Sequence, residues 1–96
     1  MDIALLEKGG SRLELFHLLD TKSLPKYRQE LMDDLAVVGT KHLCFEIINM
    51  EGIIRNLQDK HVEFVMKPNT TFYGGRYVIF KDCDGILIEL FEKVVS

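Results

Sequence analysis

Three residues of this sequence have the type and the setting to do chemistry: Glu14, His42 and Glu89. Each lies in a stretch that reads as a β-strand, and each has apolar neighbours. A carboxylate on an apolar strand face needs a partner, because burying an unpaired charge is costly in free energy. One imidazole and two carboxylates would suit a divalent metal ion with water in its open positions. A metal site is therefore one interpretation of these residues.

A structural interpretation of the same residues is also open. A glutamate on a half-buried strand commonly faces solvent, and a single histidine is more often a hydrogen-bonded structural residue than a ligand. Against this, Leu87 and Phe91 lie two residues away from Glu89 and share its strand face. Strand alternation alone leaves both interpretations in place.

The remaining polar candidates receive no site role. His17 is expected on the opposite strand face from Glu14, as a surface residue. His61 lies at a predicted helix end, where a cation complements the helix dipole. Asp82 and Asp84 precede a glycine without the spacing of a calcium-binding hand, so a hairpin turn with side-chain hydrogen bonds is favoured.

Two short stretches of the chain nearly repeat each other. Residues 13–16 read Leu-Glu-Leu-Phe, and residues 88–91 read Ile-Glu-Leu-Phe. Each follows an apolar run and a polar turn, so the shared unit is strand, tight turn, strand, with a carboxylate in the second strand. Such a repeat indicates two copies of one module. Only the second copy has a long stretch before its hairpin, so the chain reads as one complete module preceded by the back end of another.

The pattern of apolar residues and turn formers predicts an α+β fold in a single domain over residues 1–96. The expected elements are a hairpin of strands 2–7 and 11–18, a helix over about 24–35, strand 41–48, helix 50–60, strand 62–66, and strands 76–81 and 86–92. The order from residue 40 onward is β-α-β-β-β. We therefore divide the chain into a hairpin of a truncated first module (1–20), a connecting helix (24–38) and a complete βαβββ module (40–96).

Composition sets further limits. The net charge of −3 and the scattered basic residues give no reason to expect a nucleic-acid partner. No apolar run approaches the roughly 20 residues that span a bilayer, and no signal peptide is expected, so a cytoplasmic location is the default. The two cysteines lack a metal-type spacing. Cys44 is predicted to be a small core residue and Cys83 to lie in a turn, and a disulfide is not excluded.

The stretch from residue 40 to residue 92 resembles the glyoxalase/bleomycin-resistance/dioxygenase superfamily, also called vicinal oxygen chelate proteins. The most specific part is the Asp-x-Asp-Gly run at residues 82–85, followed by a strand that contains Glu89 and Leu90. Cys83 stands where that family usually has proline. The resemblance implies paired βαβββ modules whose curved, mixed sheets enclose a metal cleft.

By this resemblance, His42 matches the first-strand histidine of the second module, and Glu89 matches its last-strand glutamate. Glu14 matches the last-strand glutamate of the first module. The resemblance thus implies that Glu14, His42 and Glu89 bind a divalent ion such as Zn, Ni, Co, Mn or Fe. The strand that would bring the fourth ligand is not in this chain.

The resemblance favours a metal-dependent lyase or isomerase, including the epimerases, that acts on a small oxygenated substrate. Glu14 or Glu89 would serve as the catalytic base beside the metal. One alternative is a metal-free module that binds or sequesters a small molecule in a cleft lined by Phe72, Tyr73 and Tyr77. Another alternative is an inactive, truncated copy.

The hairpin at the start of the chain also carries an expectation about partners. Without its companion strands it would expose unpaired edges, which proteins rarely leave bare. A second copy of the chain is the natural cover, either side by side or by exchange of residues 1–20. We therefore expect a homodimer.

Overall fold

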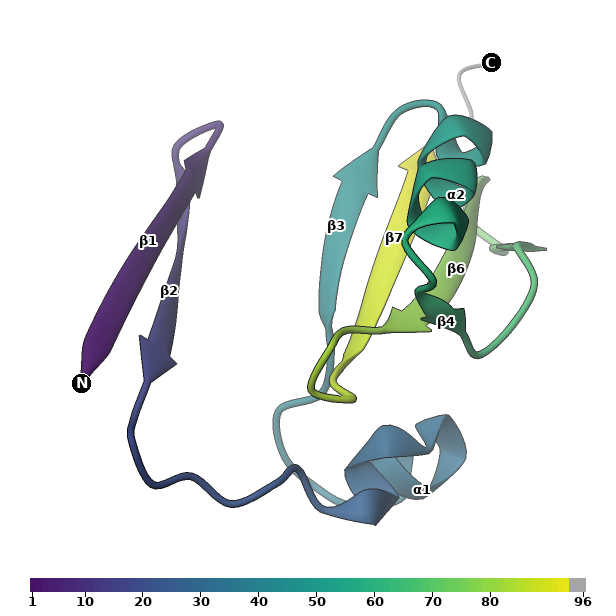
Figure 1. Ribbon diagram of the computed structural model, residues 1–96. Coiled ribbons are helices and arrows are strands. Elements are labelled where there is room, and N and C mark those ends of the chain that lie inside the picture. The colour runs from purple at the N-terminus through teal and green to yellow at the C-terminus, as the bar shows by residue number, and fades with distance from the viewer. Residues whose placement is uncertain (94–96) are drawn as a thin grey trace.

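The computed structural model, which describes residues 1–93, contains two separate sheets (Figure 1). The first is a hairpin of β1 (Asp2–Lys8) and β2 (Ser11–His17). The second has five strands: β3 (Leu43–Ile47), β4 (Glu63–Phe64), β5 (Asn69–Thr70), β6 (Gly75–Lys81) and β7 (Leu87–Lys93). With its helices, this arrangement confirms the predicted α+β class, and the short β5 is the one strand that the sequence pattern did not indicate.

The N-terminal hairpin forms as its turn residues predict. Gly9 and Gly10 have φ values of 58° and 83°, which is the left-handed region that a two-residue hairpin turn requires. β1 and β2 pair antiparallel, with Leu5 opposite Glu14. Nearly every residue of the two strands is exposed, so the hairpin is stabilised by the hydrogen bonds between its strands and not by packing in a core.

The five-stranded sheet places β3 at one edge. The strand order is β3-β7-β6-β4, and β5 also pairs with β6. β3 runs parallel to β7, whereas β6 and β7 are antiparallel. This register sets Cys44 of β3 opposite Glu89 of β7, so the first and the last strand of the module lie side by side.

One face of this sheet packs against α2 (Met50–Asp59) (Figure 1). Met50, Val78 and Leu90 form the buried cluster, and Met50 and Val78 are fully buried. Asn49 caps the helix as predicted, because its side chain accepts a hydrogen bond from the N–H of Gly52 at 3.3 Å. The opposite face of the sheet is covered in part, since Ile79 and Leu87 on that face are also buried.

Glu92 ties the start of α2 to the sheet. Its carboxylate accepts the backbone N–H of Met50 at 2.7 Å and the Arg76 guanidinium, also at 2.7 Å. The hydrogen bond from Met50, followed by the one from Arg76, lowers the pKa of Glu92 below its ordinary value. These groups lie on the α2 side of the sheet, so Arg76 is committed to structure.

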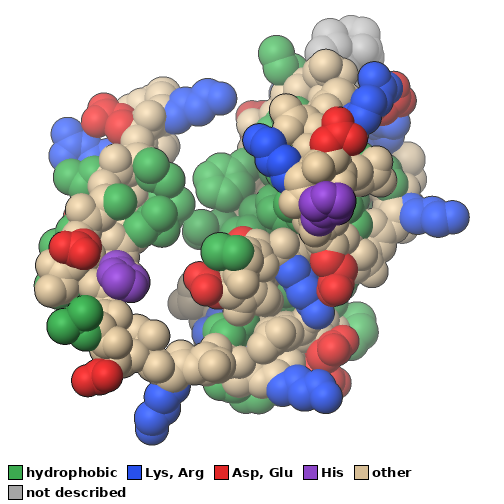
Figure 2. Space-filling model, in the orientation of Figure 1, with side chains coloured by type: hydrophobic (Ala, Val, Ile, Leu, Met, Phe, Trp, Pro, Cys, Tyr) green, Lys and Arg blue, Asp and Glu red, His purple; other side chains and the backbone are tan. Residues whose placement is uncertain are grey.

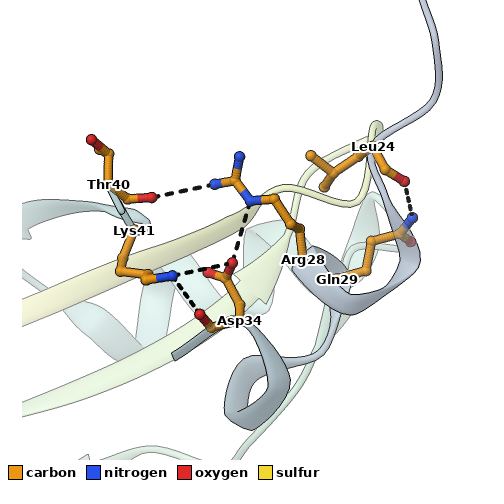
Figure 3. A network of polar contacts seen from close by, with 6 residues as sticks. All are labelled: Leu24, Arg28, Gln29, Asp34, Thr40 and Lys41. Atoms are coloured by element: carbon orange, nitrogen blue, oxygen red, sulfur yellow. Dashed lines mark hydrogen bonds and ion pairs between the residues drawn. The ribbon is translucent and has the colours of Figure 1, made fainter. Parts of the chain in front are cut away.

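The segment predicted as one connecting helix over 24–38 contains two short helices instead. These are η1 (Lys26–Gln29), a 3-10 helix, and α1 (Leu31–Leu35). Glu30 between them is extended, with φ −110° and ψ 119°, which breaks the helical ladder. The Gln29 side chain donates to the carbonyl of Leu24 at 3.0 Å (Figure 3). Within residues 1–93, no helix is long and apolar enough to cross a membrane.

A buried carboxylate joins this segment to the start of β3 (Figure 3). Asp34 is 3% exposed and accepts a hydrogen bond from Nε of Arg28 at 3.3 Å. The ammonium of Lys41 lies 3.7 Å from the Asp34 carboxylate and also donates to the Asp34 backbone carbonyl. Arg28 additionally donates to the carbonyl of Thr40. The network therefore fixes the chain immediately before His42.

The β6–β7 turn has the structure that its aspartates predict. One oxygen of Asp82 accepts the backbone N–H groups of Asp84 and Ile86, both at 2.9 Å. Gly85 has φ 86°. This is a side-chain-stabilised hairpin turn, as expected from the sequence.

Candidate functional site

The parallel pairing of β3 with β7 brings His42 and Glu89 together. His42 lies within the predicted strand 41–48 but directly precedes the observed β3, and Glu89 lies within β7. Nε2 of His42 is 2.9 Å from Oε1 of Glu89. The two side chains are only 15% and 19% exposed. The structure thus places an imidazole and a carboxylate in direct contact, on the sheet face opposite α2.

This pair fits two positions around one metal ion. Two ligand atoms that each lie about 2.0–2.2 Å from an ion are separated by roughly 3 Å, close to the 2.9 Å between Nε2 and Oε1. A metal-binding histidine usually donates its other ring nitrogen to a carboxylate or carbonyl. Here Nδ1 of His42 is buried and has no partner within the described part of the chain. The donors fit a metal, whereas the usual supporting contact is lacking.

Cys44 lies beside Glu89, and the prediction that it is a core residue is wrong. Cys44 is on the edge strand β3, where its side chain is an exposed free thiol. Partial burial, followed by the charge of Glu89, raises the pKa of Cys44 to about 11. The thiol is therefore protonated at neutral pH and donates a hydrogen bond to the carboxylate.

Glu14 does not join the other two residues. It is exposed on β2, and Figure 1 shows the hairpin separated from the five-stranded sheet. Among residues 1–93, no three His, Cys, Asp or Glu side chains are grouped closely enough to hold a metal ion. Hydrophobic side chains on the hairpin face hydrophobic side chains of the main body across the gap (Figure 2). The structure thus assembles two of the three predicted ligands, and the role of all three stays a prediction.

A hollow of about 1300 Å³ lies elsewhere, between the end of the hairpin and the β6–β7 turn. Phe16, Lys22, His61 and Asp84 are among its lining residues. Neither His42 nor Glu89 contributes to its wall. The hollow is therefore separate from the histidine–glutamate pair.

Comparisons with known proteins identify the family. The sequence matches the Glyoxalase/Bleomycin resistance protein/Dioxygenase superfamily over residues 1–90. A search of curated proteins found no match. Among solved structures, the chain resembles a glyoxalase family protein from Enterococcus faecalis, at 26% identity and a TM-score of 0.70, covering 94% of this chain and 66% of that one.

Two further structures show the same fold. A glyoxalase/dioxygenase from Nostoc punctiforme is 22% identical with a TM-score of 0.74, over 97% of this chain and 61% of that one. FosX, a genomically encoded fosfomycin resistance protein from Listeria monocytogenes, is 23% identical with a TM-score of 0.50, over 59% of this chain and 49% of that one. The chain thus spans two thirds or less of the length of these proteins. It belongs to the glyoxalase/bleomycin resistance/dioxygenase superfamily.

Proposed function

We propose that this protein is a divalent-metal-dependent lyase or isomerase, the epimerases included, that acts on a small oxygenated substrate. The observation that carries the proposal is the contact between Nε2 of His42 and Oε1 of Glu89 at 2.9 Å. The pair lies on the face of the sheet opposite α2, in a member of a superfamily whose proteins often bind divalent metals. An imidazole and a carboxylate at this separation suit one ion.

The chain's residues have distinct roles in this proposal. His42 and Glu89 hold the ion, which when bound would supply a Lewis acid for a substrate oxygen. Glu14 or Glu89 accepts the proton from the carbon beside a substrate carbonyl, and the electrons of the broken C–H bond move toward the carbonyl oxygen. In an isomerisation the same carboxyl group returns the proton to the substrate. The protonated Cys44 thiol holds one side of the Glu89 carboxylate.

A second copy of the chain completes the site in our proposal. Glu14 is exposed on a hairpin that stands apart from the main sheet (Figure 1). Among residues 1–93, β3 is an edge strand and β2 pairs with β1 alone, so each strand has an unpaired edge there. Exchange of hairpins between two chains would bring Glu14 of one chain to His42 and Glu89 of the other.

Metal content is the direct test of the proposed function. Untagged protein, purified without chelators, is expected to carry a divalent ion at about one per site, measured by plasma mass spectrometry. Protein stripped with a chelator should regain the ion on dialysis against a divalent salt. Failure to bind any of Zn, Ni, Co, Mn or Fe at micromolar concentrations would contradict the proposal.

Oligomeric state and subunit mixing test the shared site. Sedimentation equilibrium should give twice the chain mass of 11.1 kDa. The Glu14→Ala variant, mixed and refolded with the His42→Ala, Glu89→Ala double variant, should regain metal binding, because a mixed dimer contains one site with all three residues. Each variant alone should fail to bind the metal ion. A stable monomer, or mixtures that bind no more metal than the separate variants, would overturn the shared site.

A metal-free binding module is the second candidate. It is favoured by the direct contact of His42 with Glu89 and by the lack of a third ligand near them within residues 1–93. In that case the pair is a hydrogen-bonded element of a small-molecule pocket. Absence of metal in the purified protein, together with a rise in melting temperature on addition of a ligand, would favour this candidate over the enzyme.

A further inference from the structure

The polar network around Asp34 ends directly before the histidine–glutamate pair (Figure 3). The Lys41 ammonium reaches Asp34 at two points, its carboxylate and its backbone carbonyl. Arg28 donates to the same carboxylate and also to the carbonyl of Thr40. The network thus holds the two residues that directly precede His42 in the chain.

His42 has few other contacts that would fix its position. The β3–β7 ladder begins at Leu43, so His42 lies just outside the paired strand. Nδ1 of its ring is buried and has no hydrogen-bond partner among residues 1–93, so the polar contact that orients the ring is the one between Nε2 and Glu89. Consecutive Cα atoms are about 3.8 Å apart. An anchor on Lys41 therefore restricts where the His42 ring can lie.

The composition of the network suits the setting of a position. Asp34 is the one charged residue that is fully buried within residues 1–93. A buried ion pair is weak evidence for stability, because apolar side chains of similar volume often stabilise a protein equally well, although removal of one partner alone is costly. Apolar side chains lack the preferred distances and angles of hydrogen bonds. A buried carboxylate with two cations can therefore fix a backbone position that apolar packing would leave loose.

We propose that Asp34 is a positioning residue for His42 and acts through Lys41. The buried carboxylate holds the Lys41 side chain, Lys41 fixes the backbone before His42, and the ring then meets Oε1 of Glu89. A metal-binding histidine is usually oriented by a hydrogen bond to its second ring nitrogen. Here the network performs that task from the backbone side. Only the effect on metal binding rests on the proposed function.

Hydrogen exchange of the His42 ring in metal-free protein tests the proposal. A carboxylate only accepts hydrogen bonds, so Nε2 carries the proton in the contact with Glu89. Exchange of this proton, followed by NMR, is compared with exchange of the β6 backbone amides, which report opening of the sheet. In Lys41→Met the ring proton should exchange about tenfold faster relative to those amides, the effect of losing one hydrogen bond. Lys41→Arg keeps the cation and should match the wild type.

The Met50→Ala variant is the control for a general loss of stability. Met50 is fully buried in the cluster between α2 and the sheet and takes no part in the network. Its replacement should speed exchange of the ring proton and of the β6 amides together, so that their ratio stays at the wild-type value. If the ratio is also unchanged in Lys41→Met, the network only stabilises the fold and the proposal is overturned.

Zinc affinity connects the result to the proposed function. Lys41→Met should bind zinc about tenfold more weakly than the wild type, as is usual when a supporting contact of a metal ligand is lost. Folded Met50→Ala should bind zinc like the wild type. Wild-type zinc affinity in Lys41→Met would overturn the role of Asp34 at the metal. A raised exchange ratio in a protein that binds no zinc would uphold the positioning of His42 and overturn the proposed function alone.

Discussion

Replacing His42 and Glu89 together by alanine is expected to abolish binding of divalent metal. Each residue would supply one strong donor atom, and the structure brings no third ligand near them among residues 1–93. Of the three predicted ligands, the double variant keeps only Glu14, on the N-terminal hairpin. A single weak carboxylate holds a divalent ion only at millimolar concentrations, so the fall in affinity should exceed about a thousandfold. Equilibrium dialysis followed by plasma mass spectrometry measures it.

The double variant is well suited to this test because both partners of the contact are removed together. No buried donor or acceptor is then stranded by the loss of its partner, so the fold should persist. Far-ultraviolet circular dichroism checks this. A matched control, His17→Ala with Glu63→Ala, removes one histidine and one glutamate from exposed positions. Stoichiometric metal retained in the His42→Ala, Glu89→Ala protein would sink the proposed function.

Replacing Asp34 by alanine is expected to produce the largest loss of stability among single polar substitutions. Asp34 is 3% exposed and interacts with two cations, Arg28 and Lys41. The side chains of these cations are 39% and 23% exposed, so they regain water more easily than fully buried charges would. We therefore expect a cost of about 2–3 kcal/mol, below the 3–5 kcal/mol of a fully buried pair that loses one partner.

Urea unfolding monitored by circular dichroism measures this effect. The neighbouring residue Asp33 is exposed and supplies the control, because Asp33→Ala should change the free energy of unfolding by less than about 0.5 kcal/mol. Asp34→Asn should fall between the two, since it keeps an acceptor but loses the charge. Equal midpoints for the Asp33→Ala and Asp34→Ala proteins would show that the network in Figure 3 contributes nothing to stability.

The sequence predicts local structure well where turn residues and alternation agree. Gly9 and Gly10 identify the first hairpin turn, Asp82 and Gly85 the second, and Asn49 the start of α2, and each has the predicted role. These elements are determined by contacts a few residues apart in the chain. The contact of His42 with Glu89 was accessible only through the family resemblance, because strand alternation does not say which strands become neighbours.

The failures have physical causes of another kind. Leu31 and Leu35 fit a helix that starts near Leu24, but the extended Glu30 divides that helix. Helix propensity contributes little stability in so short a segment. Cys44 looks like a core residue because its neighbours are apolar, yet it lies on the edge strand β3, where its side chain is exposed. The separation of Glu14 from the main sheet depends on how two units pack together, which no local pattern encodes.

The two ends of the His42–Glu89 contact lie 47 residues apart in the chain. A helix and four strands lie between them in the chain. An ion held by both would therefore act as a removable cross-link, closing a loop that comprises nearly the whole βαβββ module. Such a link lowers the conformational entropy of the unfolded chain, as a disulfide does. Unlike a disulfide, it would make the free energy of unfolding of the module depend on the concentration of free metal ion.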